Sequence, residues 1–431
     1  MFASIAGLPP EGRATIPMKL LHILQSANPV GGGVIEAVNQ FTAAHQRQGH
    51  TVEIVSLDAP DSSFLLKCPV PVRALGRNRP GYGYAHGFSA WLRQVRCSFD
   101  AIIVNGIWQY AGFAAHAALS GTETPYVVFP HGMLDPWFKR KYPLKHLKKT
   151  LYWWLAEYRV LRDARLVLFT CEEEQRLARQ SFRPYRCREA VANLGTTASS
   201  GNPVRQRAAF HASFPGLEGK RLFLFLGRLH EKKGCDLLIR AFAKVYSGFN
   251  ADGEKPHLII AGPCADSSYL ATLTALAATS FPSEVPPITW TGMLDGEVKW
   301  GAYRAAEAFI LPSHQENFGF SVVEALSCEL PVLISDKVNI WREIHEDRAG
   351  FVETDDFDGT YRLLQGWLSM EPKLQRAMRT TALGCFMSRF EITHAAGRLI
   401  ELLNGSGNRT GEHCATLEPM TAGTIAARGS E

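Results

Sequence analysis

The sequence predicts an α/β protein with two Rossmann-like, doubly wound domains that face each other across a cleft. Three observations predict this fold. The 431 residues are too many for one ordinary hydrophobic core. Short apolar segments alternate with helical patterns, which is typical of a parallel sheet covered on both faces. The alternation also stops at a segment rich in Ser, Pro, Gly and Arg, residues 198–220, and then starts again.

In the first half, a helical pattern follows Gly31–Gly33 and places Val34, Ala37, Val38 and Phe41 on one face. Apolar runs predict strands at 19–25, 51–57, 101–104, 125–129 and 164–170. In the second half we expect helices at 235–246 and 322–326, and strands at 221–226, 257–261, 288–290, 308–311 and 331–335. Such sheets bind ligands at the carboxyl ends of their strands.

The predicted organisation has five parts. Residues 1–17 form a loose leader, 18–200 the first domain and 201–385 the second domain, with 198–220 as the linker region. Residues 386–404 form a helix that returns to the first domain, and the polar tail 405–431 is expected to be disordered.

Composition indicates a cytoplasmic globular protein. Charged residues make up 20% of the chain, the net charge is +5, and no apolar run reaches the 18 residues of a spanning helix. Glu11 and Arg13 argue against a signal peptide. The nine cysteines include no C-x-x-C pair, which argues against a disulfide framework or a metal site. We expect no nucleic-acid partner, because the basic excess is mild.

The segment 227–234, GRLHEKKG, follows a predicted strand and opens a helix. A helix N-terminus offers free N–H groups to an anion, and Arg228 and Lys233 add two charges that suit a diphosphate. A βα loop with two solvated cations explains this segment equally well. No G-x-G-x-x-G fingerprint is present here or at Gly31–Gly33.

The segment 313–324, SHQENFGFSVVE, also lies between a strand and a helix. Its carboxylates, Glu316 and Glu324, are eight residues apart and are expected to face one cleft at different depths. Carboxylates accept hydrogen bonds from pairs of sugar hydroxyls, and the N–H groups of 319–321 point toward a phosphate. Taken singly, each glutamate is more often an ordinary loop or helix residue.

The combination G-R-x-x-x-x-K-G and E-x-F-G-x-x-x-x-E resembles the retaining glycosyltransferases of family 4, which have the GT-B fold. Gly32-Gly33, the pattern QGHTV at 48–52 and Pro130-His131-Gly132 agree with it. The resemblance runs from about residue 19 to about residue 404.

The resemblance implies specific roles. Catalytic residues at the reacting sugar would be His131, Glu316, Arg228 and Lys233. Gly32, Gly33, Arg228, Lys233, Phe318, Gly319 and Glu324 would bind the donor, with Glu316 on its sugar and Glu324 on its ribose. Asn105 and Trp108 would lie on the acceptor side. Without the resemblance, His131 would be interpreted as a core or capping histidine.

The sequence departs from the family pattern at three places. Glu329 replaces the usual glycine before Pro331, and Ala192-Asn193-Leu194-Gly195 replaces a common P-N-G turn. Asn105 stands where relatives often have His, which bears on acceptor choice.

The implied reaction is transfer of a sugar, with retention, from a GDP- or UDP-linked donor to a glycan or lipid-linked acceptor. The leaving group is already a diphosphate, so cations and helix N-termini are expected to stabilise its charge. We expect no cofactor and no metal, since the sequence contains no His/Cys cluster. The alternatives are a nucleotide-sugar epimerase and a non-catalytic nucleotide- or carbohydrate-binding protein on the same fold.

A basic segment at 136–155, PWFKRKYPLKHLKKTLYWWL, carries six Lys or Arg residues. Leu144, Leu147, Leu151 and Trp154 share one helical face. Aromatic residues beside cations suit an anionic bilayer, and Trp137, Phe138 and Trp153 are expected to assist. The segment therefore predicts peripheral membrane binding and a polyprenyl-diphosphate-linked acceptor used in surface polysaccharide biosynthesis. An ordinary amphipathic helix with a solvated basic face is the alternative.

Overall fold

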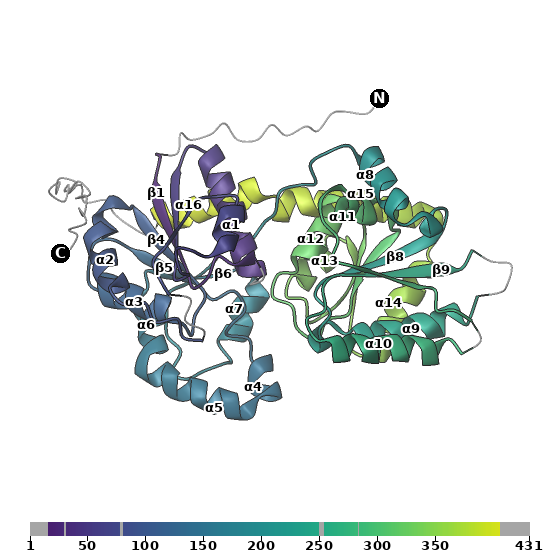
Figure 1. Cartoon of the computed structure of the whole chain (residues 1–431), viewed down its shortest axis with the longest axis horizontal. Helices are drawn as coiled ribbons and strands as arrows, with labels where there is room; N and C mark the ends of the chain where they lie inside the picture. Colours follow the sequence, from purple (N-terminus) through teal and green to yellow (C-terminus); the bar gives the residue numbers. More distant parts are fainter. Residues whose placement is uncertain (1–15, 30–31, 78–80, 250–253, 283, 406–431) are drawn as a thin grey trace, which may run out of the picture.

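The computed structural model describes residues 16–29, 32–77, 81–249, 254–282 and 284–405, apart from the side chains of residues 138 and 140. Gly31, nearly all of the predicted leader and residues 406–431 of the predicted tail lie outside this range. The described chain forms two α/β domains side by side, with helix α16 (Ile392–Gly405) along one edge of the first domain (Figure 1). The predicted fold class is confirmed.

The first domain contains a parallel sheet in the order β3-β2-β1-β4-β5-β6-β7. Its strands are β1 (Lys19–Leu24), β2 (Thr51–Ser56), β3 (Val72–Ala74), β4 (Ala101–Asn105), β5 (Tyr126–Phe129), β6 (Leu166–Phe169) and β7 (Glu189–Val191). Its helices are α1 (Gly33–Arg47), α2 (Phe88–Val95), α3 (Tyr110–Leu119), α4 (Trp137–Lys141), α5 (Pro143–Tyr152), α6 (Tyr158–Asp163) and α7 (Glu172–Ala178), with a π-helical turn, η4 (Trp153–Glu157), between α5 and α6.

The second domain contains a parallel sheet in the order β10-β9-β8-β11-β12-β13. Its strands are β8 (Arg221–Leu226), β9 (Pro256–Ala261), β10 (Ile288–Gly292), β11 (Ala308–Leu311), β12 (Val332–Ser335) and β13 (Gly350–Glu353). Its helices are α8 (Pro203–Ser213), α9 (Cys235–Tyr246), α10 (Ser267–Ser280), α11 (Gly296–Ala305), α12 (Phe320–Ser327), α13 (Trp341–Glu346), α14 (Phe357–Leu368) and α15 (Pro372–Cys385).

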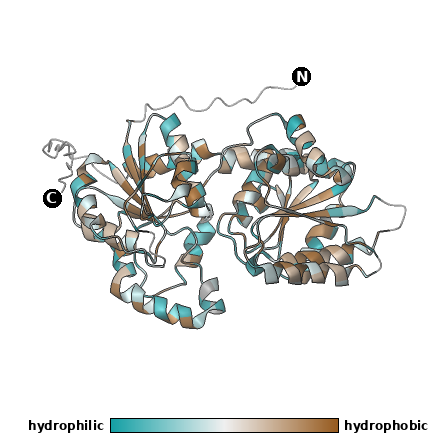
Figure 2. Cartoon of the chain, viewed as in Figure 1, coloured by the Kyte–Doolittle hydropathy of each residue, from teal (hydrophilic) through white to brown (hydrophobic). Residues whose placement is uncertain are grey.

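Apolar strands occupy the interior of both domains because helices cover both faces of each sheet. All five residues of β4 are buried, and so are all four residues of β11. Figure 2 shows the central strands in the brown of hydrophobic residues. Helix α1 buries Ile35, Val38 and Phe41 at helical spacing. Ala37, Val38 and Phe41 of the predicted face are therefore core positions, whereas Val34 is only partly buried and Ile35, which was not predicted, is buried.

The strand order explains where ligands can bind. In the first sheet the order reverses between β1 and β4, and in the second sheet it reverses between β8 and β11. Ligands of open α/β sheets bind beyond the carboxyl ends of the strands at such a reversal. The motif residues Gly32, Asn105, Arg228 and Glu316 follow or end these four strands. The fold therefore brings them to two facing edges.

The linker prediction for 198–220 is wrong in part, because α8 occupies residues 203–213. Asn202 caps this helix by accepting hydrogen bonds from the N–H groups of Val204 and Arg205, and Pro203 occupies its first turn. An Asn-Pro pair at a helix start is a recognised signal that the composition of the segment obscured. The short strands β3, β7 and β13 were also not predicted, since three or four residues show little periodicity.

Helix α16 lies against α1 of the first domain. The side chain of Gln48 donates a hydrogen bond to the carbonyl of Thr393 at 3.0 Å, and His45 Nε2 lies 3.1 Å from the carbonyl oxygen of Ala396. Beside it, the crossing between the domains pairs Thr196 with Glu391. The chain therefore passes between the domains along two neighbouring segments.

Candidate active site

The glycine turn of the first domain faces the basic loop of the second. Gly32 has φ +77°, and a Cβ built on it would lie 3.8 Å from Arg228 Nη2. A Cβ on Gly33 would lie 3.6 Å from the ring of Phe320, which begins α12. The start of α1, the Arg228 guanidinium and the start of α12 therefore border one narrow space between the domains.

Lys233 and Glu316 form an ion pair across 83 residues of sequence. Lys233 lies in a 3-10 turn that ends at Gly234, where a Cβ would be only 2.2 Å from the carbonyl oxygen of Pro312. Glycine there lets the two loops touch. Burial, followed by the charges of Lys232 and Arg228, lowers the pKa of Lys233. The cation predicted for the diphosphate and the carboxylate predicted for the sugar are thus direct neighbours.

Glu324 is held by two residues of α11 that sequence reasoning missed. Lys299 Nζ lies 2.6 Å from one carboxylate oxygen, and the Tyr303 hydroxyl lies 2.8 Å from the other. The two residues are four positions apart on a helix, so they share one face. This four-residue spacing was the signal in the sequence by which the two residues could have been found. The arrangement orients the Glu324 carboxylate, and each oxygen keeps a lone pair for a further donor.

Phe318 and Gly319, both predicted to bind the donor, have different positions in the structure. The Phe318 side chain is buried and packs against Phe320 and Phe390, so a donor could meet only its backbone. Gly319 has φ +76° and caps the N-terminus of α12. This helix start presents free N–H groups toward the space bordered by Gly33.

His131 is the last residue of a buried polar chain that runs through Asn105 to His22. The Asn105 amide nitrogen lies within 3.3 Å of His22 Nδ1 and of the carbonyls of Ile23 and Ile103. Its oxygen therefore faces His131 Nε2, at 3.2 Å, and accepts a hydrogen bond from that nitrogen. Burial lowers the pKa of His131 to about 4, so the ring is neutral near pH 7. Asn105 orients the His131 ring through this hydrogen bond, and the Asn105 residue is itself 3% exposed.

Trp108 covers the side of the site formed by the first domain. Its indole N–H donates to the carbonyl of Met133 at 3.1 Å, and Lys149 Nζ lies 4.7 Å from the ring centre. Its backbone N–H donates to Glu157 at 3.0 Å, and burial raises the pKa of that carboxyl to about 8. Trp108 and His131 both have positive φ, 70° and 50°, which is costly for non-glycine residues and is found at functional sites.

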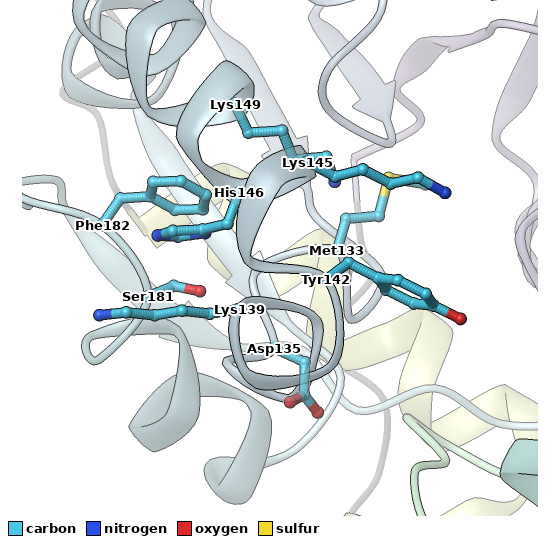
Figure 3. Close-up of a pocket in the computed structure, with 9 residues that line it drawn as sticks. All are labelled: Met133, Asp135, Lys139, Tyr142, Lys145, His146, Lys149, Ser181 and Phe182. Atoms are coloured by element: carbon cyan, nitrogen blue, oxygen red, sulfur yellow. The ribbon is translucent and has the colours of Figure 1, made fainter.

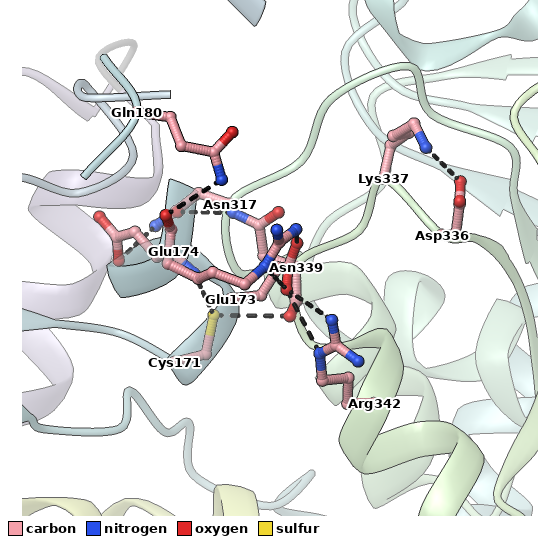
Figure 4. A network of polar contacts seen from close by, with 10 residues as sticks. Cys171, Glu173, Glu174, Gln180, Asn317, Asp336, Lys337, Asn339 and Arg342 are labelled. Carbon is pink, nitrogen blue, oxygen red and sulfur yellow. Dashed lines mark hydrogen bonds and ion pairs between the residues drawn. The ribbon is translucent and has the colours of Figure 1, made fainter. Parts of the chain in front are cut away.

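A buried carboxylate, Glu174, links the two domains and was also missed from sequence. It accepts hydrogen bonds from the N–H and hydroxyl of Thr170, at 2.8 and 2.6 Å, and from the N–H of Gly132. Asn317 of the second domain donates to the same carboxylate at 3.4 Å (Figure 4). It also donates to the Thr170 hydroxyl at 3.1 Å. The network connects Gly132, which follows His131, with Asn317, which follows Glu316.

Further contacts between the domains surround this network. Glu173 forms an ion pair with Arg342 at 3.0 Å, and the Cys171 thiol lies 3.5 Å from the carbonyl oxygen of Asn339 (Figure 4). A pocket of about 480 Å³ beside them is lined by residues of both domains, including Asp135 and His314. The two domains are therefore held together along one side, and a pocket lies between them that none of the predicted donor residues lines.

The basic segment forms α4 and α5 beside this site, around a small cavity of about 70 Å³ (Figure 3). Leu144, Leu147, Leu151 and Trp154 are 83, 69, 64 and 58% exposed, as their shared face predicts. The expectation for Trp153 is wrong: it is fully buried and stacks on Phe182, because adjacent residues of a helix point in different directions.

The expectation that Lys149 is one of the membrane-facing cations is also wrong. It is half-buried over Trp108 and lines the cavity in Figure 3. Phe138 and Arg140 lie in α4, and their side chains are outside the described residues. In the part of the chain that the structure describes, no helix has the length and apolarity to cross a membrane, and no His, Cys, Asp or Glu cluster is placed to hold a metal.

Comparison with known proteins agrees with this geometry. Residues 32–193 match the glycosyl transferase 4-like domain, and residues 206–382 match the glycosyl transferases group 1 family. A GDP-mannose:cellobiosyl-diphosphopolyprenol alpha-mannosyltransferase of Xanthomonas oryzae is 28% identical over 89% of this chain and 96% of its own length. A D-inositol 3-phosphate glycosyltransferase of Streptomyces scabiei is 28% identical over 53% of this chain and 51% of its own length.

Solved structures share the fold. Anabaena HepE in complex with UDP superposes with a TM-score of 0.71 at 18% identity, over 90% of this chain and all of that one. Sucrose-phosphate synthase of Thermosynechococcus elongatus superposes with a TM-score of 0.68 at 16% identity, over 90% of this chain and all of that one. The two family matches together cover more than half of the chain, and the chain therefore belongs to the group 1 glycosyltransferases of the GT-B fold.

Proposed function

We propose that the protein is a retaining glycosyltransferase that moves a sugar from a GDP- or UDP-linked donor to a lipid-linked glycan during surface polysaccharide biosynthesis. One observation carries the proposal: the N-terminus of α1, Arg228, the Lys233–Glu316 pair and the start of α12 border a single space between the domains. Two cations and two helix starts suit a diphosphate. The carboxylates of Glu316 and Glu324 suit the hydroxyls of the sugar and the ribose.

The Lys233–Glu316 pair suggests how the donor is received. A diphosphate that reaches Lys233 competes with Glu316 for the ammonium group. Its arrival releases the carboxylate, which is then available to accept hydrogen bonds from the hydroxyls of the transferred sugar. Arg228 and Lys233 stabilise the charge that develops as the diphosphate leaves, a contribution of about 10²–10³ in rate for one such contact. Because these cations supply the charge, we propose transfer without a metal.

We propose retention because the resemblance to the retaining family 4 glycosyltransferases implies it. Glu174 is committed to hydrogen bonds from Thr170 and Gly132, and Glu316 is assigned to the hydroxyls of the sugar, so neither carboxylate is assigned as a base. We propose that the acceptor oxygen attacks the anomeric carbon on the face from which the diphosphate departs. The bond between that carbon and the phosphate oxygen breaks, and the acceptor proton passes to this departing oxygen.

A donor and acceptor screen with product analysis tests the proposal. The Xanthomonas relative suggests GDP-mannose as the first donor and a polyprenyl-diphosphate-linked glycan as the first acceptor. UDP-glucose should be included as the alternative. NMR of the product should show the anomeric configuration of the donor, and EDTA should leave the rate unchanged. An inverted product contradicts retention, and an epimerised donor without transfer favours the epimerase alternative.

We further propose that α4 and α5 bring the enzyme to an anionic bilayer. Helix α5 has no buried residue, and Leu144, Leu147 and Leu151 are all more than 60% exposed. Burying one such side chain is worth about 1.5–3 kcal/mol, and each nearby Lys adds about 1 kcal/mol at an anionic surface. Lys145 and Lys148 flank the apolar face. A lipid-linked acceptor would be met at this surface.

Flotation with vesicles tests the membrane proposal separately. The wild type should float with anionic vesicles at low salt and leave neutral ones, and high salt should release it. Leu147→Gln with Leu151→Gln should abolish flotation, whereas Leu374→Gln, on an exposed leucine of α15, should not. A wild type that stays in the soluble fraction would overturn membrane binding and leave the donor chemistry untouched.

A further inference from the structure

A basic pocket lies in the second domain, away from the proposed donor site. Its volume is about 350 Å³, and its walls come from α8, the start of β8, the end of α11 and α15. Five of the residues that line it are cationic, and one is acidic: Arg207, Lys220, Arg221, Arg304, Arg379 and Glu307. A pocket of this size is within the range of small-molecule sites.

The acidic residue does not neutralise this charge. Glu307 forms a two-pronged ion pair with Arg221, at 2.9 and 3.0 Å, and also accepts the indole N–H of Trp367. Arg379 donates to the backbone carbonyls of Ala306 and Glu307. Among the described residues, Arg207, Lys220 and Arg379 form no ion pair. Three cationic side chains without an ion pair therefore surround one concave surface and make it attractive to an anion.

Two polar atoms of the pocket residues also lack a partner. Arg304 Nε and His211 Nδ1 are buried and accept or donate no hydrogen bond within the described structure. Arg304 reaches Glu329 only at 4.0 Å, through a different nitrogen. Buried polar groups are nearly always satisfied, and a polar ligand in this pocket would supply partners for these two atoms.

The pocket is separate from the diphosphate position. Arg221 and Lys220 lie at the start of β8, whereas Arg228 follows its end. A six-residue strand spans about 20 Å, so one ligand of this size cannot reach both places. Several guanidinium groups around one concave surface match the oxygen-rich geometry of phosphate groups.

We propose that this pocket binds a small, multiply charged, phosphate-bearing metabolite at a site distinct from the donor site. The ligand would connect α8 and β8 with α15. Helix α15 continues through the π-helical turn Phe386–Phe390 into α16, the helix that lies on the first domain. Occupancy should therefore stiffen the segment that crosses between the domains, and should raise the melting temperature of the full chain.

Calorimetric titration of the full chain with inorganic pyrophosphate tests the proposal. Pyrophosphate can also enter the donor site, so Lys233→Gln is used to weaken that site. The new site should remain in Lys233→Gln, and Arg207→Gln with Lys220→Gln should weaken it at least tenfold. Both of these side chains are exposed at the rim, so the fold should be kept. Lys244→Gln with Lys373→Gln, which remove the same charge elsewhere in the domain, should leave the affinity unchanged.

Two results would overturn the existence of a second site. One is wild-type binding that disappears completely in Lys233→Gln, since all pyrophosphate would then be in the donor site. The other is equal weakening by the rim pair and the control pair, since net charge alone would then explain the affinity. Sulfate at the same concentration should compete weakly. Equal competition by sulfate would reduce the site to non-selective anion binding and would contradict a phosphate ligand.

Discussion

Replacing Lys233 with Ala removes a cation from the centre of the proposed donor site. The Lys233 and Glu316 side chains are 13 and 20% exposed, so water screens their ion pair only in part. Breaking a fully buried pair costs about 3–5 kcal/mol, and the residual exposure here reduces the expected loss of folding stability to about 2 kcal/mol. The effect on transfer should be larger, about 10²–10³ in rate or roughly 3–4 kcal/mol, because the departing diphosphate loses a charge-assisted contact.

Three measurements separate the two effects: the melting temperature, the transfer rate at saturating and limiting donor, and calorimetry with the nucleoside diphosphate. Lys337→Ala is a matched control, because Lys337 is 44% exposed and pairs with the neighbouring Asp336 in the same domain. It should change stability by less than about 1 kcal/mol and leave donor affinity intact. Normal turnover of Lys233→Ala at both donor concentrations would refute the diphosphate role, whatever happens to the melting temperature.

Three further predictions follow from the same geometry. Glu316→Ala should lower turnover and leave nucleoside diphosphate affinity nearly unchanged, whereas Glu324→Ala should lower that affinity; equal calorimetric losses would contradict the assignment to sugar and ribose. Gly132→Ala should slow transfer at least tenfold, because its Cβ would lie 2.7 Å from Asn317, whereas Gly121→Ala, at a similar φ in open space, should cost only stability. Burial raises the pKa of Glu157 to about 8, so the native state holds a proton that the unfolded state releases near pH 4.5. Stability should therefore fall as pH rises from 4.5 to 8, by at most about 1.4 kcal/mol per unit, and Glu157→Gln should abolish that decline in melting temperature.

Much of the fold could be predicted from the sequence because the signals are local. The strands 221–226 and 308–311 and the helix 235–246 occur at the predicted bounds. Apolar runs and helical periodicity depend only on residues that are close in sequence, so they can be recognised without knowledge of the fold. The same holds for Gly32, Gly234 and Gly319, whose positive φ values mark sharp turns before helices.

Partnerships between distant residues could not be predicted in this way. Lys233 pairs with Glu316 across 83 residues, and Glu174 meets Asn317 across 143. These contacts depend on the strand order and on how the domains dock, neither of which a local pattern encodes. Lys299 and Tyr303 were missed for the same reason, since a helix face says nothing of the carboxylate that lies opposite.

The sequence by itself determined the two α/β halves, the turns that carry the motifs and the family to which the chain belongs. Only the tertiary structure decided which charges are neighbours and which side chains are buried. Trp153 and Trp154 show the physical reason: the two are identical and adjacent in sequence, yet one is fully buried against Phe182 and the other is 58% exposed. Burial is a property of the surface packed against a residue, and that surface comes from elsewhere in the chain.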